Sequence, residues 1–171
     1  MFAAIFPGQG SQSVGMMKDL YESSDRIRDL YDIASSVLDY DLWELTASDS
    51  SSKLNDTVYT QPAMLVAGVA SWESYISRFS LLPQYMAGHS LGEYSALVCS
   101  GVINFTDALK IVQTRAKYMA EAVPSNSGAM AAIIGSTDKD VIDLCEFAKG
   151  NEILSAVNFN APGQVVIAGN K

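Results

Sequence analysis

Tyr85-Met-Ala-Gly-His-Ser-Leu-Gly92 is the stretch of sequence that decides the fold. Its first four residues predict a short strand, and residues 93–100 predict a helix with Gly101 at its C-terminal cap. A GxSxG sequence between a strand and a helix is typical of a sharp turn that exposes a serine hydroxyl. The stretch therefore predicts the α/β class with Ser90 as the candidate nucleophile. The alternative is a glycine-flanked serine in an ordinary helix cap.

The chain before this stretch predicts one further strand and two helices. An apolar run over 2–6 stops at a Pro-Gly turn and indicates an interior strand. Helical spacing of apolar residues over 25–38 predicts an amphipathic helix that covers one face of a sheet. Thr60 suits the N-cap and Pro62 the first turn of a second helix, which we expect to end near Phe79.

The chain after the stretch predicts a second subdomain. Asn104 caps a helix whose apolar stripe reaches Val123, and a break over 124–128 follows. A strand, a helix and two further strands then come in the order β, α, β, β. A ferredoxin-like unit needs one more helix and strand to complete its packing. We therefore divide the chain into a large subdomain, 1–123, and the start of a small one, 124–171.

The composition excludes several classes of function. Asp and Glu number 19 against 11 Lys and Arg, and the resulting net charge of −8 argues against a surface for nucleic acid or anionic membrane. The longest apolar stretch, 63–70, is far shorter than the roughly 20 residues of a membrane span. Cys99 and Cys145 lie far apart without metal-ligand spacing. We therefore expect no disulfide framework, no metal site and a reducing, cytoplasmic compartment.

The two neighbours of a serine nucleophile, a base and an oxyanion hole, are less clear in the sequence. His89 is the single histidine, and its position next to Ser90 predicts a ring that points away from the hydroxyl. We interpret His89 as a support for the turn and leave the general base unassigned. The glycine-rich loop after the first strand lacks the third glycine of a dinucleotide fingerprint. It either supplies the backbone N–H of Gln9 to an oxyanion hole or only supports the strand.

Arg115 is the candidate cation of the site. It falls on or beside the apolar face of its helix, where a guanidinium needs a partner. A substrate carboxylate and an internal Asp or Glu both fit, and position alone slightly favours the internal salt bridge. With Lys110 and Lys117 it forms a basic cluster that suits phosphate or an acidic partner, or is a solvated helix face. Gln61 either hydrogen-bonds a neighbouring loop or occupies the first turn of its helix.

A series of motifs runs through essentially the whole chain. In order, they are Phe6-Pro-Gly-Gln-Gly-Ser-Gln12, Gln61-Pro-Ala63, Gly88-His-Ser-Leu-Gly-Glu-Tyr-Ser-Ala-Leu97, Arg115, Gly128-Ala-Met-Ala131 and Asn158-Phe-Asn-Ala-Pro-Gly-Gln-Val-Val-Ile-Ala-Gly169. With these motifs the sequence resembles the malonyl-CoA:acyl carrier protein transacylases of bacterial fatty acid synthesis. The implied fold is an α/β-hydrolase-like large subdomain with an inserted ferredoxin-like small subdomain.

The resemblance also implies a reaction and a set of site residues. Ser90 takes the malonyl group from coenzyme A as an ester and gives it to the phosphopantetheine thiol of acyl carrier protein. The N–H groups of Gln9 and Leu91 form the oxyanion hole. Arg115 binds the malonyl carboxylate, which reverses the salt-bridge preference, and Gln61 belongs to the substrate-binding set. The coenzyme A thioester is a substrate, and no metal or redox cofactor is implied.

Members of that family continue past the point where this chain stops, and their general-base histidine, a further glutamine and the last strands of the large subdomain lie there. We therefore expect an N-terminal portion that is impaired or inactive alone and exposes apolar surface. The expected consequence is either poor solubility or association with a complementary C-terminal chain. Ala161 stands where the family commonly has serine. The alternatives are a polyketide-type acyltransferase, a serine esterase or thioesterase, and an inactive fragment that only binds.

Overall fold

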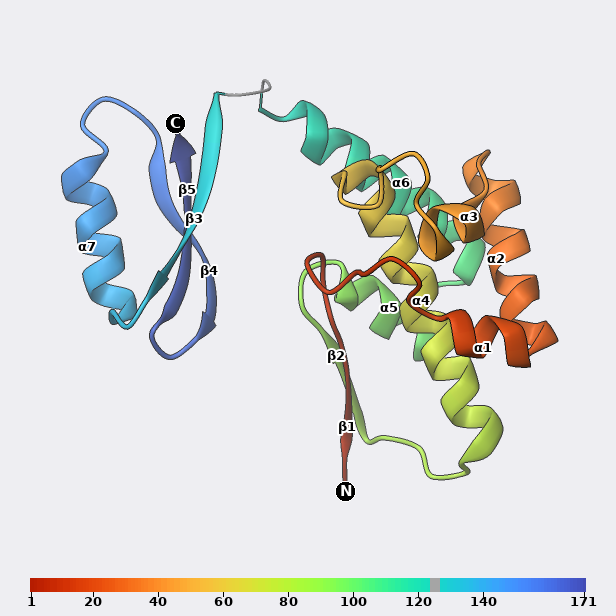
Figure 1. The fold of residues 1–171 in the computed structure, drawn as a ribbon. Coiled ribbons are helices and arrows are strands. Elements are labelled where there is room, and N and C mark those ends of the chain that lie inside the picture. Colours follow the sequence, from red (N-terminus) through yellow and green to blue (C-terminus); the bar gives the residue numbers. More distant parts are fainter. Residues whose placement is uncertain (124–126) are drawn as a thin grey trace. The chain divides into compact units, whose positions relative to one another are not determined.

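The computed structural model describes residues 1–123 and 127–171 (Figure 1). The chain divides into two compact units, Met1–Ala120 and Glu121–Lys171. The subdomain boundary predicted between 123 and 124 adjoins residues 124–126, which lie outside the described part, and the predicted break over 124–128 covers them. The two units are therefore taken in turn.

A two-stranded parallel sheet positions the candidate nucleophile in the first unit. β1 (Ala3–Phe6) pairs with β2 (Tyr85–Gly88), with Phe6 opposite Gly88, and α5 (Gly92–Cys99) packs on both strands (Figure 1). Because the strands are parallel, the loops that follow them leave at the same end of the sheet. The prediction of an interior strand was wrong in one respect: Ile5 is 70% exposed, because β1 pairs on one edge and helices cover one face.

Helices rather than strands form most of the core of the first unit. α2 (Asp25–Leu38) has the predicted bounds, but it packs on α3 (Leu42–Ala47) and α4 (Thr57–Arg78) rather than on a sheet. This difference arises because α4 is buried on several sides over its first half and itself offers an apolar surface to α2. The core brings together Ile27, Tyr31, Ala34, Leu38, Leu42, Leu45, Leu54, Met64, Leu65, Val66, Val69, Leu91, Leu109 and Val112.

Two helix starts show how capping decides boundaries. Asn104 caps α6 (Phe105–Glu121) as predicted, since its Oδ1 accepts from the Asp107 amide at 2.8 Å. α4 begins at Thr57 instead of Thr60, because Asp56 is the N-cap and its carboxylate accepts from the Val58 amide at 3.1 Å. Thr60 instead donates its hydroxyl to backbone carbonyls. An earlier α1 (Lys18–Ser23) had no sequence prediction.

The apolar stripe of α6 is buried only in part. Leu109, Val112 and Ala116 are fully buried, whereas Met119 is 49% and Val123 is 53% exposed. The predicted apolar stripe reached Val123, but α6 ends at Glu121, so Val123 lies beyond the helix and that bound was wrong. The last turn of the helix extends beyond the core, and Met119 lies beside the site described below.

The second unit has the predicted order β, α, β, β. β3 (Gly128–Ile134), α7 (Asp138–Ala148), β4 (Leu154–Ala161) and β5 (Gln164–Asn170) form an antiparallel sheet with β5 in the centre and α7 along one face (Figure 1). Val141 and Cys145 of α7 pack on Val165 of the sheet. Met130 and Phe159 are exposed. The chain is thus of the mixed α/β class, and completion of a ferredoxin-like unit stays a prediction.

Candidate active site

The turn between β2 and α5 holds Ser90 in a rare backbone conformation. Its φ of 53° lies in the left-handed region, which L residues seldom adopt outside functional turns. The flanking glycines are required by close approach. A Cβ at Gly88 would lie 1.9 Å from the Gly92 carbonyl carbon, and one at Gly92 would lie 2.1 Å from the Phe6 oxygen. This steric arrangement is the one that the GxSxG sequence predicts, and it leaves Ser90 exposed.

His89 contributes its backbone to the same turn. Its N–H donates to the Phe6 carbonyl at 3.1 Å, and its own carbonyl accepts from the Gly92 N–H at 2.9 Å. Its ring lies against Gly8, because a Cβ at that glycine would be 3.3 Å from Nδ1. The structure therefore places His89 between the turn and the loop that follows β1.

The loop after β1 is held by Asn55, which lies just before α4, and by Thr57, the first residue of α4. Gln12 accepts from the Gly10 N–H at 2.7 Å and donates to Asn55 Oδ1 at 2.8 Å. Gln9 Oε1 accepts from the hydroxyl of Thr57 at 2.7 Å. Sequence reasoning missed Thr57, because the predicted helix began at Thr60 and left Thr57 outside it, whereas the observed α4 places Thr57 four residues before Gln61.

Two backbone N–H groups are available at the end of the sheet. Within the described part of the chain, neither the Gln9 amide nor the Leu91 amide has a protein acceptor. Gln9 follows β1 and Leu91 is the N-cap of α5, so each comes just after one of the paired strand ends. Donors in these positions have the chemistry of an oxyanion hole.

Arg115 of α6 reaches the serine. Its Nη2 donates to Ser90 Oγ at 3.1 Å, and its Nη1 donates to Gln61 Oε1. The guanidinium also lies over the ring of Tyr94, 5.7 Å from the centroid. Among residues 1–123 and 127–171 no carboxylate forms an ion pair with Arg115, so the internal salt bridge is not found. Since a guanidinium cannot accept a proton, this contact does not supply the general base.

Gln61 is the buried link of the site. Its side chain is 0% exposed and its Oε1 accepts from Arg115. Its Nε2 donates to Thr57 Oγ1 at 3.1 Å and lies 3.3 Å from the sulfur of Met119. Both interpretations made from sequence were wrong in detail: the hydrogen-bond partners of Gln61 lie on α4 and α6 rather than on a loop, and Gln61 follows the first turn because α4 begins at Thr57.

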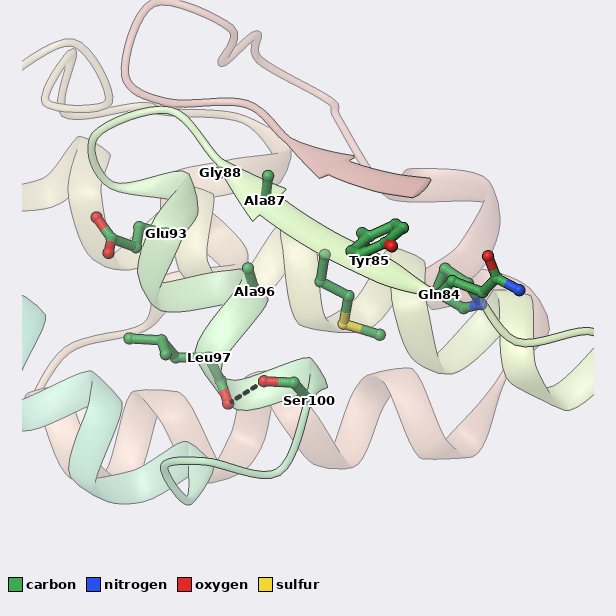
Figure 2. A pocket seen from close by; sticks show the side chains of 10 residues that line it. Gln84, Tyr85, Ala87, Gly88, Glu93, Ala96, Leu97 and Ser100 are labelled. Atoms are coloured by element: carbon green, nitrogen blue, oxygen red, sulfur yellow. Dashed lines mark hydrogen bonds between the residues drawn. The ribbon is translucent and has the colours of Figure 1, made fainter. Parts of the chain in front are cut away.

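A hollow beside β2 is distinct from this site (Figure 2). Residues 83–88 line it together with Glu93, Ala96, Leu97 and Ser100 of the α5 region, and the Ser100 hydroxyl donates to the Leu97 carbonyl at 3.2 Å. Neither Ser90 nor Arg115 belongs to its lining.

In the part of the chain that the structure covers, no group of three or more His, Cys, Asp or Glu side chains is arranged to hold a metal ion. No helix among the described residues combines the length and the apolar character that crossing a bilayer requires.

A strand–serine–helix turn of this kind also occurs in serine hydrolases, so the turn alone does not define the family. The chain belongs to the acyl transferase domain family, whose model matches residues 3–171. It is 51% identical to the malonyl CoA-acyl carrier protein transacylase of Salmonella typhimurium and 52% identical to that of Escherichia coli K12, each over 99% of this chain and 55% of the relative. The chain thus spans about half the length of the curated relatives it matches.

Solved structures give the same family. The malonyl CoA-acyl carrier protein transacylase of Coxiella burnetii matches with a TM-score of 0.96 and 44% identity, over 99% of this chain and 54% of the other. A malonyl-transacylase in complex with its type II polyketide acyl-carrier protein matches with a TM-score of 0.95 and 49% identity, over 99% and 55%.

Proposed function

We propose that the protein transfers a malonyl group from coenzyme A to acyl carrier protein through an ester on Ser90. The observation that carries the proposal is the contact of 3.1 Å between Arg115 Nη2 and Ser90 Oγ. It sets a cation beside a nucleophile, and the described residues give that cation no carboxylate. A substrate that brings its own carboxylate completes the arrangement.

The first half-reaction forms the ester. Ser90 Oγ attacks the thioester carbon while a base removes its proton, and the carbon–sulfur bond breaks to release the thiol of coenzyme A. The carbonyl oxygen becomes negative in the tetrahedral intermediate, where the amides of Gln9 and Leu91 stabilise it. His89 supports the turn through its backbone contacts with Phe6 and Gly92. In the second half-reaction the thiol of the carrier protein attacks the ester and regenerates the hydroxyl.

Arg115 selects the acyl group. The carboxylate of a malonyl ester is one methylene beyond the reacting carbonyl, so it lies within reach of a guanidinium that already touches Oγ. Arginine has five N–H donors, and the contacts with Gln61 and Ser90 use two of them. The remaining donors allow capture of the carboxylate through two oxygens.

The chemistry needs no metal or redox group, because a thioester is already activated for attack and the serine carries the acyl group. Coenzyme A enters as part of the substrate. Both cysteines are free thiols, which suits a reducing compartment such as the cytoplasm.

The test is the intact mass of the protein, as its gene encodes it, before and after incubation with malonyl-CoA. We expect the wild type to gain one malonyl group and Ser90→Ala to gain none. Addition of acyl carrier protein should then remove the label from the enzyme. Label on Ser90→Ala, or a folded wild type that stays unlabelled, would overturn the proposal.

A second candidate acceptor is a polyketide carrier protein. The matched complex of a malonyl-transacylase with its type II polyketide acyl-carrier protein favours this candidate. Discharge of the malonyl-enzyme by a fatty acid carrier and by a polyketide carrier, at equal concentration, separates the two acceptors. Release of free malonate without any carrier would indicate a serine hydrolase instead.

A further inference from the structure

Thr57, the first residue of α4, contacts both halves of the candidate site. Its hydroxyl donates to Gln9 Oε1 at 2.7 Å and accepts from Gln61 Nε2 at 3.1 Å. The loop after β1, residues 7–12, carries Gln9 and is called the oxyanion loop below. We propose that Thr57 is a positioning residue that holds this loop and the carboxylate-binding arginine in register with each other. This inference rests on the proposed function and assigns a role to a residue outside the family motifs described above.

The donor and acceptor of each hydrogen bond in the series Arg115–Gln61–Thr57–Gln9 follow from the arginine. A guanidinium only donates, so Gln61 must present Oε1 to Arg115 and Nε2 to Thr57. The hydroxyl of Thr57 then accepts, and its single proton is free to be donated to Gln9. The charge on Arg115 thereby fixes the orientation of a side chain in the oxyanion loop three hydrogen bonds away.

Burial makes Gln61, in the middle of this series of hydrogen bonds, sensitive to the loss of a partner. Gln61 is fully buried, and the other neighbour of its Nε2 is the sulfur of Met119, a weak acceptor. Without the hydroxyl of Thr57, a buried donor loses its strong partner and the amide has reason to rotate. Rotation would turn Nε2 towards Arg115, which offers only donors. The guanidinium would then lose the partner that orients it.

The oxyanion loop has a second attachment that does not involve Thr57. Gln12 joins the Gly10 amide to Asn55, two residues before the threonine. Loss of the Thr57 hydroxyl should therefore leave the loop folded while it frees the side chain of Gln9. The amide of Gln9 would then be less well aimed, which affects every acyl group alike.

Two separate losses follow from one substitution. Thr57→Val removes the hydroxyl and keeps the shape, so misorientation of Arg115 should lower kcat/KM for malonyl-CoA about tenfold more than for acetyl-CoA. Misalignment of Gln9 should also lower kcat for acetyl-CoA, by a factor of about three to ten. Thr57→Ser keeps both hydrogen bonds and should restore both values.

The experiment compares these variants in the protein as its gene encodes it, with Thr106→Val as the matched control. Thr106 also lies at the start of a helix, and Thr106→Val removes one side-chain hydrogen bond, to Asn104, whereas Thr57→Val removes two. Asn104 is not one of the site residues. We expect Thr106→Val to keep the wild-type ratio of malonyl to acetyl activity. Combining Thr57→Val with Arg115→Ala should add no further loss of that ratio, because the threonine acts through the arginine.

Each of these measurements tests the positioning role of Thr57. An unchanged ratio in Thr57→Val, failure of Thr57→Ser to restore it, or additive losses in the double variant would each overturn the positioning role. The proposed function is tested separately by the Ser90-dependent malonyl label on the wild type. A labelled wild type with an unaffected Thr57→Val refutes only the role of Thr57.

Discussion

Gly92→Ala tests whether close contact between the serine turn and the first strand creates the site. The added Cβ would lie 2.1 Å from the Phe6 carbonyl oxygen and 2.7 Å from the Pro7 carbonyl oxygen. Ordinary contact begins at 3.4 Å, so the turn and the strand end must separate by about 1 Å. Both obstructing atoms belong to the backbone, which cannot rotate away as a flexible side chain does.

The expected effects concern both stability and rate. Overpacking of this size costs about 1–3 kcal/mol or more, which corresponds to a fall in melting temperature of roughly 2–12 °C for a chain of this length. A displacement of about 1 Å between Ser90 and the amide of Gln9 should slow acylation by malonyl-CoA about 100-fold. Thermal unfolding and the rate of appearance of the malonyl label measure the two effects.

Gly101→Ala is the matched control. Gly101 has a φ of 78° but nothing lies within 4 Å of the position of its Cβ, so alanine there brings backbone strain without collision. We expect a loss of about 1–2 kcal/mol and a normal rate of acylation. A Gly92→Ala protein that melts and acylates like the wild type would refute the steric account of the turn.

Three further predictions use other parts of the structure. Arg115→Gln removes a charge-assisted contact of about 1.5–3 kcal/mol, so acylation by malonyl-CoA should fall about 10- to 150-fold while acylation by acetyl-CoA is spared; equal losses would contradict the carboxylate role. Leu65→Ala empties a fully buried position and should cost about 2–5 kcal/mol in urea unfolding, whereas Leu81→Ala, at a site 68% exposed, should stay near the wild type. Burial raises the pKa of the Cys99 thiol to about 12, so its alkylation at pH 8 should be slow until urea unfolds the chain. Because the folded pKa lies above the unfolded one, this thiol should also make stability fall as pH rises from about 9 towards 12; a folded protein that alkylates at the rate of the unfolded chain would contradict this.

The sequence predicted the turn at Ser90 well, because steric needs act locally there. The glycines two residues before and after the serine have no Cβ, so backbone atoms of neighbouring segments can approach them closely. The structure shows this close approach at both positions. The order of the strands and helices after residue 127 could likewise be predicted from local sequence. The start of α4 could not, because Asp56 and Thr60 both suit an N-cap and only the fold decides between them.

Partners of polar side chains were harder to predict than elements. Periodicity placed Arg115 beside an apolar face but gave no way to choose among the groups that share that face. Its contacts with Gln61 and Ser90 join positions 54 and 25 residues apart in the chain. Thr57 was not predicted for the same reason, since its role depends on hydrogen bonds to two partners on different segments. α2 was assigned to a sheet because an amphipathic pattern does not reveal what covers it.

The left-handed backbone conformation at Ser90 implies a trade-off between activity and thermal stability. A non-glycine residue in that conformation costs about 1–2 kcal/mol relative to glycine, and the fold bears this cost where the hydroxyl must be presented. A population of variants selected for heat resistance alone should therefore accumulate glycine at position 90 and lose acylation. Selection for acylation should retain the serine and recover the lost stability at distant core positions.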